Sequence, residues 1–133
     1  MVSYINNRVL LVENDSQLSE VMKHTLDQKG CCVHTAVDIA CARWSLGENI
    51  PDIIIIDIDL PGGNGIDLCR DVRSVSDIPV ILISDQTKTD ELLEKVFDAG
   101  ADEYMVKPVN LNELALRIKS LIRRIKWVKT TKL

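Results

Sequence analysis

Four consecutive isoleucines, Ile53–Ile56, run directly into an aspartate at position 57. β-Branched side chains favour strands, where they pack well on a pleated surface. A strand that is apolar at every position, instead of every second one, has both faces covered, and this is typical of parallel sheets between helices. The segment therefore predicts an interior strand of a parallel sheet that delivers an acid to the edge of the sheet.

The rest of the chain alternates strand-like and helix-like segments. Five short apolar runs predict strands: Arg8–Glu13, Cys32–Ala36, Ile53–Asp57, Val80–Ser84 and Glu103–Val106. After each run, apolar residues recur at helical spacing. Strands that alternate with helices form a parallel sheet with right-handed crossovers. We therefore expect an α/β fold, a doubly wound five-stranded parallel sheet in the order 2-1-3-4-5, which is the flavodoxin-like (βα)5 sandwich.

Length and composition limit the class of protein. A chain of 133 residues, 46% hydrophobic and 27% charged, fits one domain with a buried core. The apolar runs are too short to cross a membrane, and the N-terminus does not resemble a signal peptide, so we expect a cytoplasmic location and no membrane contact. The four cysteines have no metal-ligand spacing with each other or with the two histidines. We expect them to be ordinary buried or half-buried side chains.

Charge is unevenly distributed along the chain. The segment from Lys119 to Leu133 contains six basic residues and no acid, whereas the whole chain has a net charge of -4. A basic tail of this kind is most often a solvated helix end or a linker. We expect one domain over residues 1–124, followed at 125–133 by a basic helix end or linker.

Polar residues follow four of the five predicted strands at the point where each strand ends. The carboxyl ends of parallel strands share one edge, and a crevice opens there where the strand order reverses. We therefore expect these residues to converge, although 44, 27 and 23 positions separate the successive strand ends. They are Glu13, Asn14 and Asp15 at the end of the first strand, Asp57 at the end of the third, Ser84 at the end of the fourth and Lys107 just after the fifth.

These residue types suit phosphoryl transfer. A carboxylate can attack phosphorus and form an acyl phosphate. Acids bind Mg²⁺, which prefers oxygen ligands and keeps some waters. A lysine and a hydroxyl can neutralise or hydrogen-bond phosphoryl oxygens. Asp57 is best placed as the nucleophile, because its strand is central and projects it into the crevice.

Four segments resemble the receiver domain of two-component response regulators, over about Arg8 to Arg124. They are VLLVEND, IIIIDIDLPGGNG, PVILIS and GADEYMVKP. The resemblance implies that Asp57 is the phosphoacceptor and that Lys107 is the family's invariant lysine. It also implies that Ser84 is the switch hydroxyl, which turns to bond the phosphoryl group. Tyr104 would be the switch aromatic residue, which fills the space that Ser84 leaves.

The resemblance also implies a magnesium site. Glu13 and Asn14 occupy the positions of the family's acidic pair, and Mg²⁺ would be held by Asn14, Asp57 and the main-chain carbonyl of Asp59. Asn14 departs from the pattern, since most relatives have a carboxylate there. We expect weakened Mg²⁺ binding, with Glu13 as a possible additional ligand and the Asp59 carboxylate as a possible holder of a metal-bound water.

A receiver domain implies particular partners. A sensor histidine kinase would supply the phosphoryl group, and the output surface would comprise the fourth helix, the fifth strand and the fifth helix, through which we expect a weak homodimer. The final helix, NLNELALRIKSLIRRIKWVKTTKL, resembles the closing helix and linker of the winged-helix OmpR/PhoB type. That type implies transcriptional control, with DNA bound only through an effector domain missing from this sequence. The domain would be no enzyme beyond its own phosphorylation and dephosphorylation.

Two alternatives remain open from the sequence. Asn14, together with Asp85 where the family usually has a small residue, suits a degenerate receiver that acts as a phosphorylation-independent protein-interaction module. The segment IIIIDIDLPGG also resembles the nucleophile motif of haloacid-dehalogenase-like phosphatases, in which Asp59 would be the acid/base. The order of the residues along the chain argues against the phosphatase. Those enzymes place an acidic metal-binding motif after the lysine, whereas here the candidate metal-binding acids precede Asp57.

Overall fold

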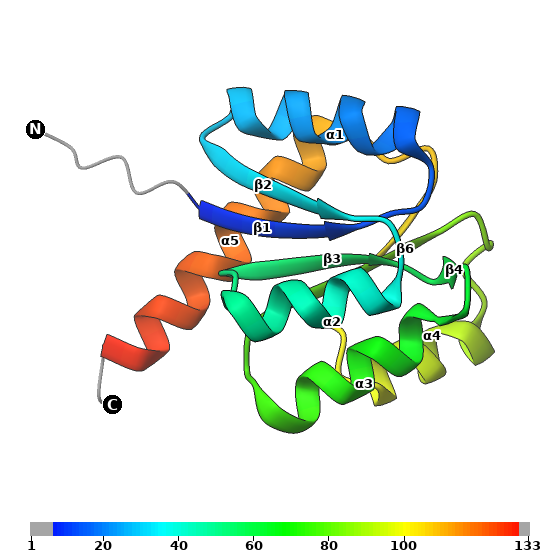
Figure 1. Ribbon diagram of the computed structural model, residues 1–133. Coiled ribbons are helices and arrows are strands. Elements are labelled where there is room, and N and C mark those ends of the chain that lie inside the picture. Colours follow the sequence, from blue (N-terminus) through cyan, green and yellow to red (C-terminus); the bar gives the residue numbers. More distant parts are fainter. Residues whose placement is uncertain (1–6, 131–133) are drawn as a thin grey trace, which may run out of the picture.

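The computed structural model describes residues 7–130, with side chains described as far as Trp127. A five-stranded parallel sheet lies between two layers of helices (Figure 1). In spatial order the strands are β2 (Cys31–Ala36), β1 (Asn7–Val12), β3 (Ile53–Asp57), β6 (Val80–Ser84) and β7 (Glu103–Val106). The helices are α1 (Ser16–Gln28), α2 (Ile39–Glu48), α3 (Gly65–Val75), α4 (Asp90–Asp98) and α5 (Leu111–Thr130). The predicted fold and strand order are confirmed.

The isoleucine strand β3 explains the two-layer arrangement. Ile54 and Ile56 pack with α2, α3 and α4 on one face of the sheet, and Ile53 and Ile55 pack with α1 and α5 on the other. All four side chains are fully buried. Burial of such a side chain contributes about 1.5–3 kcal/mol relative to exposure. β3 is therefore anchored from both sides, which fixes the position of Asp57 at its end.

Capping residues start the helices close to the strand ends. The Asp15 carboxylate accepts hydrogen bonds from the main-chain N–H groups of Gln17 and Leu18, at 3.0 and 3.1 Å, and so begins α1. Only Glu13 and Asn14 separate this cap from the end of β1. An N-cap of this kind satisfies main-chain donors that have no partner within the helix. The short connection holds Glu13 at the edge of the sheet.

A small hairpin follows β3 and was not predicted from the sequence. β4 (Asp59–Leu60) pairs antiparallel with β5 (Gly63–Asn64), around a turn in which Gly62 has a φ of 75°. The chain then returns so closely that a Cβ at Gly65 would collide with the main-chain oxygen of Asp57. The hairpin therefore fixes Asp59 beside the end of β3.

Two expectations from composition concern membrane-spanning helices and the cysteines. Within residues 7–130, no helix has the length and apolar character needed to cross a membrane. Cys31 and Cys69 are buried and Cys32 is half-buried, but Cys41 is exposed, so the prediction was wrong for Cys41. Neighbouring positions on a helix point in different directions. Because Ala42 is the buried residue of α2, Cys41 beside it faces solvent.

Candidate functional site

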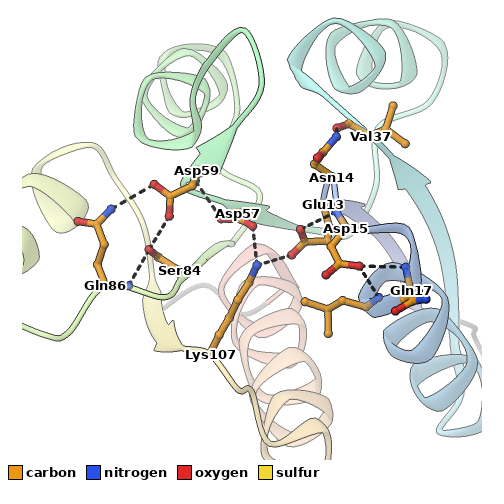
Figure 2. Close-up of polar contacts among 11 residues, drawn as sticks. Glu13, Asn14, Asp15, Gln17, Val37, Asp57, Asp59, Ser84, Gln86 and Lys107 are labelled. Carbon is orange, nitrogen blue, oxygen red and sulfur yellow. Dashed lines mark hydrogen bonds and ion pairs between the residues drawn. The ribbon is translucent and has the colours of Figure 1, made fainter.

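Lys107 lies between two buried carboxylates at the carboxyl edge of the sheet (Figure 2). Its Nζ atom is 2.6 Å from Asp57 Oδ2 and 2.8 Å from Glu13 Oε1. The main-chain N–H of Lys107 donates to the Ser84 carbonyl at 2.9 Å, which anchors the lysine to the end of the neighbouring strand. The structure therefore brings together three of the residues that the strand ends predicted to converge.

The charges in this cluster do not balance. Glu13 and Asp57 are 2% and 4% exposed, and one lysine serves both. Burial raises the pKa of Glu13, and the negative charge of Asp57 adds to this, although Lys107 opposes it. Burial alone would lower the pKa of Lys107, but its contacts with Asp57 and Glu13 outweigh burial and raise it. Lys107 is thus held in its charged form, and a site with two acids can accept a further cation.

Asp57 has a fixed orientation with unused acceptor capacity. Its Oδ1 accepts the main-chain N–H of Asp59 at 2.9 Å, and its Oδ2 accepts Lys107 at 2.6 Å. A carboxylate offers about four acceptor positions, so two hydrogen bonds leave some free. The side chain is therefore oriented by its neighbours while it keeps lone pairs for a new bond.

Ser84 belongs to a second cluster next to the first. Its hydroxyl donates to Asp59 Oδ2 at 3.0 Å and accepts the main-chain N–H of Gln86 at 3.0 Å. The Gln86 amide donates to Asp59 Oδ1 at 3.3 Å, and the Tyr104 hydroxyl donates to the Gln86 carbonyl at 2.6 Å. Burial raises the pKa of Tyr104, whose ring already lies in the interior at 2% exposure.

Gln86 was not among the residues predicted from the sequence. The Asp59 carboxylate was expected to hold a metal-bound water or, in the phosphatase alternative, to act as the acid/base. The one available signal for Gln86 was its position two residues after the serine that ends a strand. That signal is weak, because polar residues are common in any loop. Only the tertiary structure shows that Asp59, from the hairpin, and Gln86 contact both Ser84 and each other (Figure 2).

Asn14 lies at the margin of the charged cluster. Its amide nitrogen lies 3.4 Å from the Val37 carbonyl and donates to it, and its side chain turns toward Val37 instead of Asp57 (Figure 2). The residue is exposed, unlike the adjacent Glu13. The two positions predicted to form the acidic pair therefore point in different directions. Glu13 contacts Lys107, whereas Asn14 faces outward.

The residues present fit a hydrated Mg²⁺ ion. Glu13 Oε1 is buried and, despite its closeness to Lys107, accepts no hydrogen bond of acceptable geometry within the described part of the chain. A metal-bound water could donate to such an oxygen. In the same part of the chain, no three His, Cys, Asp or Glu side chains gather into a metal site. Any magnesium site here would therefore also need the Asp59 carbonyl, the Asn14 amide and waters, which Mg²⁺ readily retains.

Comparison with known proteins gives concordant matches. A family model described as the response regulator receiver domain matches residues 9–119. The transcriptional regulatory protein PrrA of Mycobacterium tuberculosis is 40% identical over 118 residues, which are 88% of this chain and 50% of PrrA. The DNA-binding response regulator MtrA of Mycobacterium leprae is 32% identical over 120 residues, which are 90% of this chain and 53% of MtrA. The chain therefore spans about half the length of these relatives.

A solved structure shows the same architecture. The crystal structure of a two-component response regulator from Clostridium difficile has a TM-score of 0.85 and 27% sequence identity, and the match covers 90% of this chain and 98% of that one. Together with the family model, this similarity favours the receiver interpretation over the haloacid-dehalogenase-like one.

The imbalance of charge predicts that Glu13→Gln stabilises the protein at neutral pH. The pKa of Glu13 is higher in the fold than in the unfolded chain, so the fold favours the protonated carboxyl. The stability gained from this preference is fully present below the unfolded pKa of about 4.3, and it is lost as pH rises through the folded pKa and Glu13 ionises. We expect Glu13→Gln to raise the free energy of unfolding at pH 7, because it removes the unbalanced charge while Lys107 stays paired with Asp57. The gain should disappear near pH 4.

Urea unfolding with a chelator present measures this difference at both pH values. Glu48→Gln, at the exposed end of α2, is the matched control and should change stability by less than about 0.5 kcal/mol. A loss of stability in Glu13→Gln at pH 7 would contradict the proposed imbalance.

Proposed function

Because this chain belongs to the response regulator receiver domain family, we propose that Asp57 accepts a phosphoryl group from a sensor histidine kinase. The observation that best supports this role is the 2.6 Å contact between Lys107 Nζ and Asp57 Oδ2. That contact places a positive charge beside the one carboxylate that ends the central strand. The domain thus acts as the phosphorylated switch of a two-component system.

The chemistry requires one bond to form and one to break. An Asp57 oxygen attacks the phosphorus of a phosphohistidine, the P–N bond breaks, and the imidazole leaves with the electron pair. The product is an acyl phosphate on Asp57. Lys107 offsets the negative charge of the phosphoryl oxygens, and Ser84 can donate a hydrogen bond to one of them. Mg²⁺, when bound by Asp57, the Asp59 carbonyl and the Asn14 amide, supplies further charge neutralisation.

We place the receiver domain at residues 1–124 and regard residues 125–133 as a basic helix end or linker toward an effector domain. α5 continues across position 124 to Thr130, so the two parts share one helix. The relatives, about half of whose length this chain covers, include a transcriptional regulatory protein and a DNA-binding response regulator. Transcriptional control through such an effector domain is therefore the output that we propose.

Phosphorylation of Asp57 is directly testable. Incubation with acetyl phosphate and Mg²⁺ should add one phosphoryl group, because a small donor can reach an oriented carboxylate without a kinase. Intact-mass spectrometry should show this addition in the wild type and in the control Asp98→Ala, which changes an exposed residue of α4. Asp57→Ala should show none.

An unmodified wild type, or equal modification of Asp57→Ala, would contradict the proposal. The first result would favour the second candidate function, a phosphorylation-independent interaction module. The outward orientation of Asn14 is the observation that supports that candidate.

We also propose that the surface of α4, β7 and α5 forms a weak homodimer. This surface carries both signs of charge, including ion pairs between Lys95 and Glu91 at 3.8 Å and between Arg117 and Glu103 at 3.7 Å. A mixed-charge surface can pair with its own copy across a two-fold axis. Sedimentation velocity should show association that strengthens with beryllofluoride, whereas a strict monomer at high concentration in both states would contradict it.

Asn14 should limit the affinity for Mg²⁺. A missing charge about 5 Å from a unit charge changes the interaction by roughly 3 kcal/mol at an effective dielectric constant of 20, and a doubly charged ion doubles this value. Loss of repulsion on Asp57 opposes the effect, so we expect Asn14→Asp to tighten Mg²⁺ binding by about tenfold, equivalent to about 1.4 kcal/mol.

Isothermal calorimetry compares the wild type with Asn14→Asp and with Asn49→Asp. Asn49→Asp makes the same change in charge at the far end of α2 and should leave the affinity unaltered. An unchanged affinity in Asn14→Asp would show that Glu13 already supplies the missing charge.

A further inference from the structure

The Ser84 hydroxyl, which the proposed function assigns to the phosphoryl group, already has an acceptor. It donates to Asp59 Oδ2 at 3.0 Å, and Ser84 is fully buried. Asp59 is held in turn by the Gln86 amide at 3.3 Å. Figure 2 shows the Asp59 side chain turned toward Ser84 and Gln86, while the Asp57 carboxylate is turned toward Lys107.

A serine hydroxyl has a single proton to donate, and an ionised carboxylate can only accept. Asp59 and a phosphoryl oxygen therefore compete for one O–H group. The main-chain N–H of Gln86 occupies one lone pair of Ser84 Oγ, which restricts the directions in which the hydroxyl can point. A hydrogen bond to a charged acceptor is stronger than one between neutral groups, so the existing bond is a substantial competitor.

We propose that Asp59 is a positioning residue that holds the Ser84 hydroxyl in the resting state, and that the phosphoryl group must displace it from Ser84. This inference rests on the proposed phosphorylation of Asp57. Asp59 acts here through Ser84, independently of any metal ligand that its main chain supplies. The carboxylate therefore sets how readily the switch responds to a given amount of phosphoryl donor.

The contacts of Asp59 separate this role from a structural one. The hairpin is held by main-chain pairing between Asp59 and Asn64, and the contact with Asp57 uses the main-chain N–H of Asp59. The hydrogen bonds described for the carboxylate go to the side chains of Ser84 and Gln86. Removing the carboxylate should therefore free Ser84 and leave the hairpin in place.

Loss of Asp59 also removes a negative charge near Asp57, and this alone would favour an anionic phosphoryl group. The two effects differ in their dependence on Ser84. Charge repulsion acts whether or not the hydroxyl is present, whereas competition for the hydroxyl requires it. A double-mutant cycle between Asp59 and Ser84 therefore isolates the proposed effect.

The test is titration of the full chain with beryllofluoride, a phosphoryl mimic, at saturating Mg²⁺, with calorimetry as the readout. We expect Asp59→Ala to tighten binding about tenfold more in the Ser84 background than in the Ser84→Ala background, as expected for release of one charged hydrogen bond. Gln86→Ala should tighten binding less, in the same direction. Asp85→Ala is the matched control, because it removes an exposed acid next to Ser84 and should act equally in both backgrounds.

The outcomes distinguish the two proposals. An equal effect of Asp59→Ala in both backgrounds, or a weaker affinity in the Ser84 background, would overturn the role of Asp59 and leave the phosphorylation of Asp57 standing. A wild type that binds no beryllofluoride would overturn both. Thermal unfolding of each variant before titration checks that the fold is intact.

Discussion

The edge of the sheet that carries the site depends on one lysine placed between two buried carboxylates, whose charges it offsets only in part. Lys107 follows β7, the edge strand, and reaches past the end of β6 to Asp57 on β3 and Glu13 beyond β1. Burial of paired charges is weak evidence for stability, because desolvation can exceed the Coulombic gain. The isoleucines of β3 offset this cost by anchoring Asp57 from both faces of the sheet. The fold thus supports an electrostatically unfavourable edge, which is where a functional site is expected.

Two clusters lie at this edge, one around Lys107 and one around Ser84, and short contacts connect them. The charged cluster consists of Glu13, Asp57 and Lys107. The main-chain N–H of Asp59 donates to Asp57 at 2.9 Å and connects this cluster to the hairpin. The Asp59 carboxylate then contacts Ser84, and the loop after Ser84 contacts Tyr104 through the Gln86 carbonyl. The loop that leads to α4 is therefore hydrogen-bonded to both Ser84 and Tyr104. The Tyr104 ring is buried, and its hydroxyl joins it to this loop.

Local patterns in the sequence predicted the fold and most of the charged cluster, because both depend on apolar periodicity and on the common edge of parallel strands. The remaining features depend on tertiary packing. The hairpin after β3 consists of two-residue strands, which are too short to show alternation. The outward orientation of Asn14 and the contacts of Asp59 with Ser84 and Gln86 are set by neighbours far away in the sequence. Assignment of Asp57 as the phosphoacceptor came from the resemblance to a family together with its place on the central strand.

A crystal structure of the chain with beryllofluoride and Mg²⁺ would test the roles of Asp57 and Ser84 together, since it locates the phosphoryl mimic at atomic detail. We expect beryllium bonded to an Asp57 carboxylate oxygen and Lys107 Nζ within hydrogen-bonding distance of a fluorine. We also expect Ser84 Oγ to have turned from Asp59 toward the fluoride. Beryllium bonded to Glu13 or Asp59, with Asp57 still free, would contradict the proposed role of Asp57.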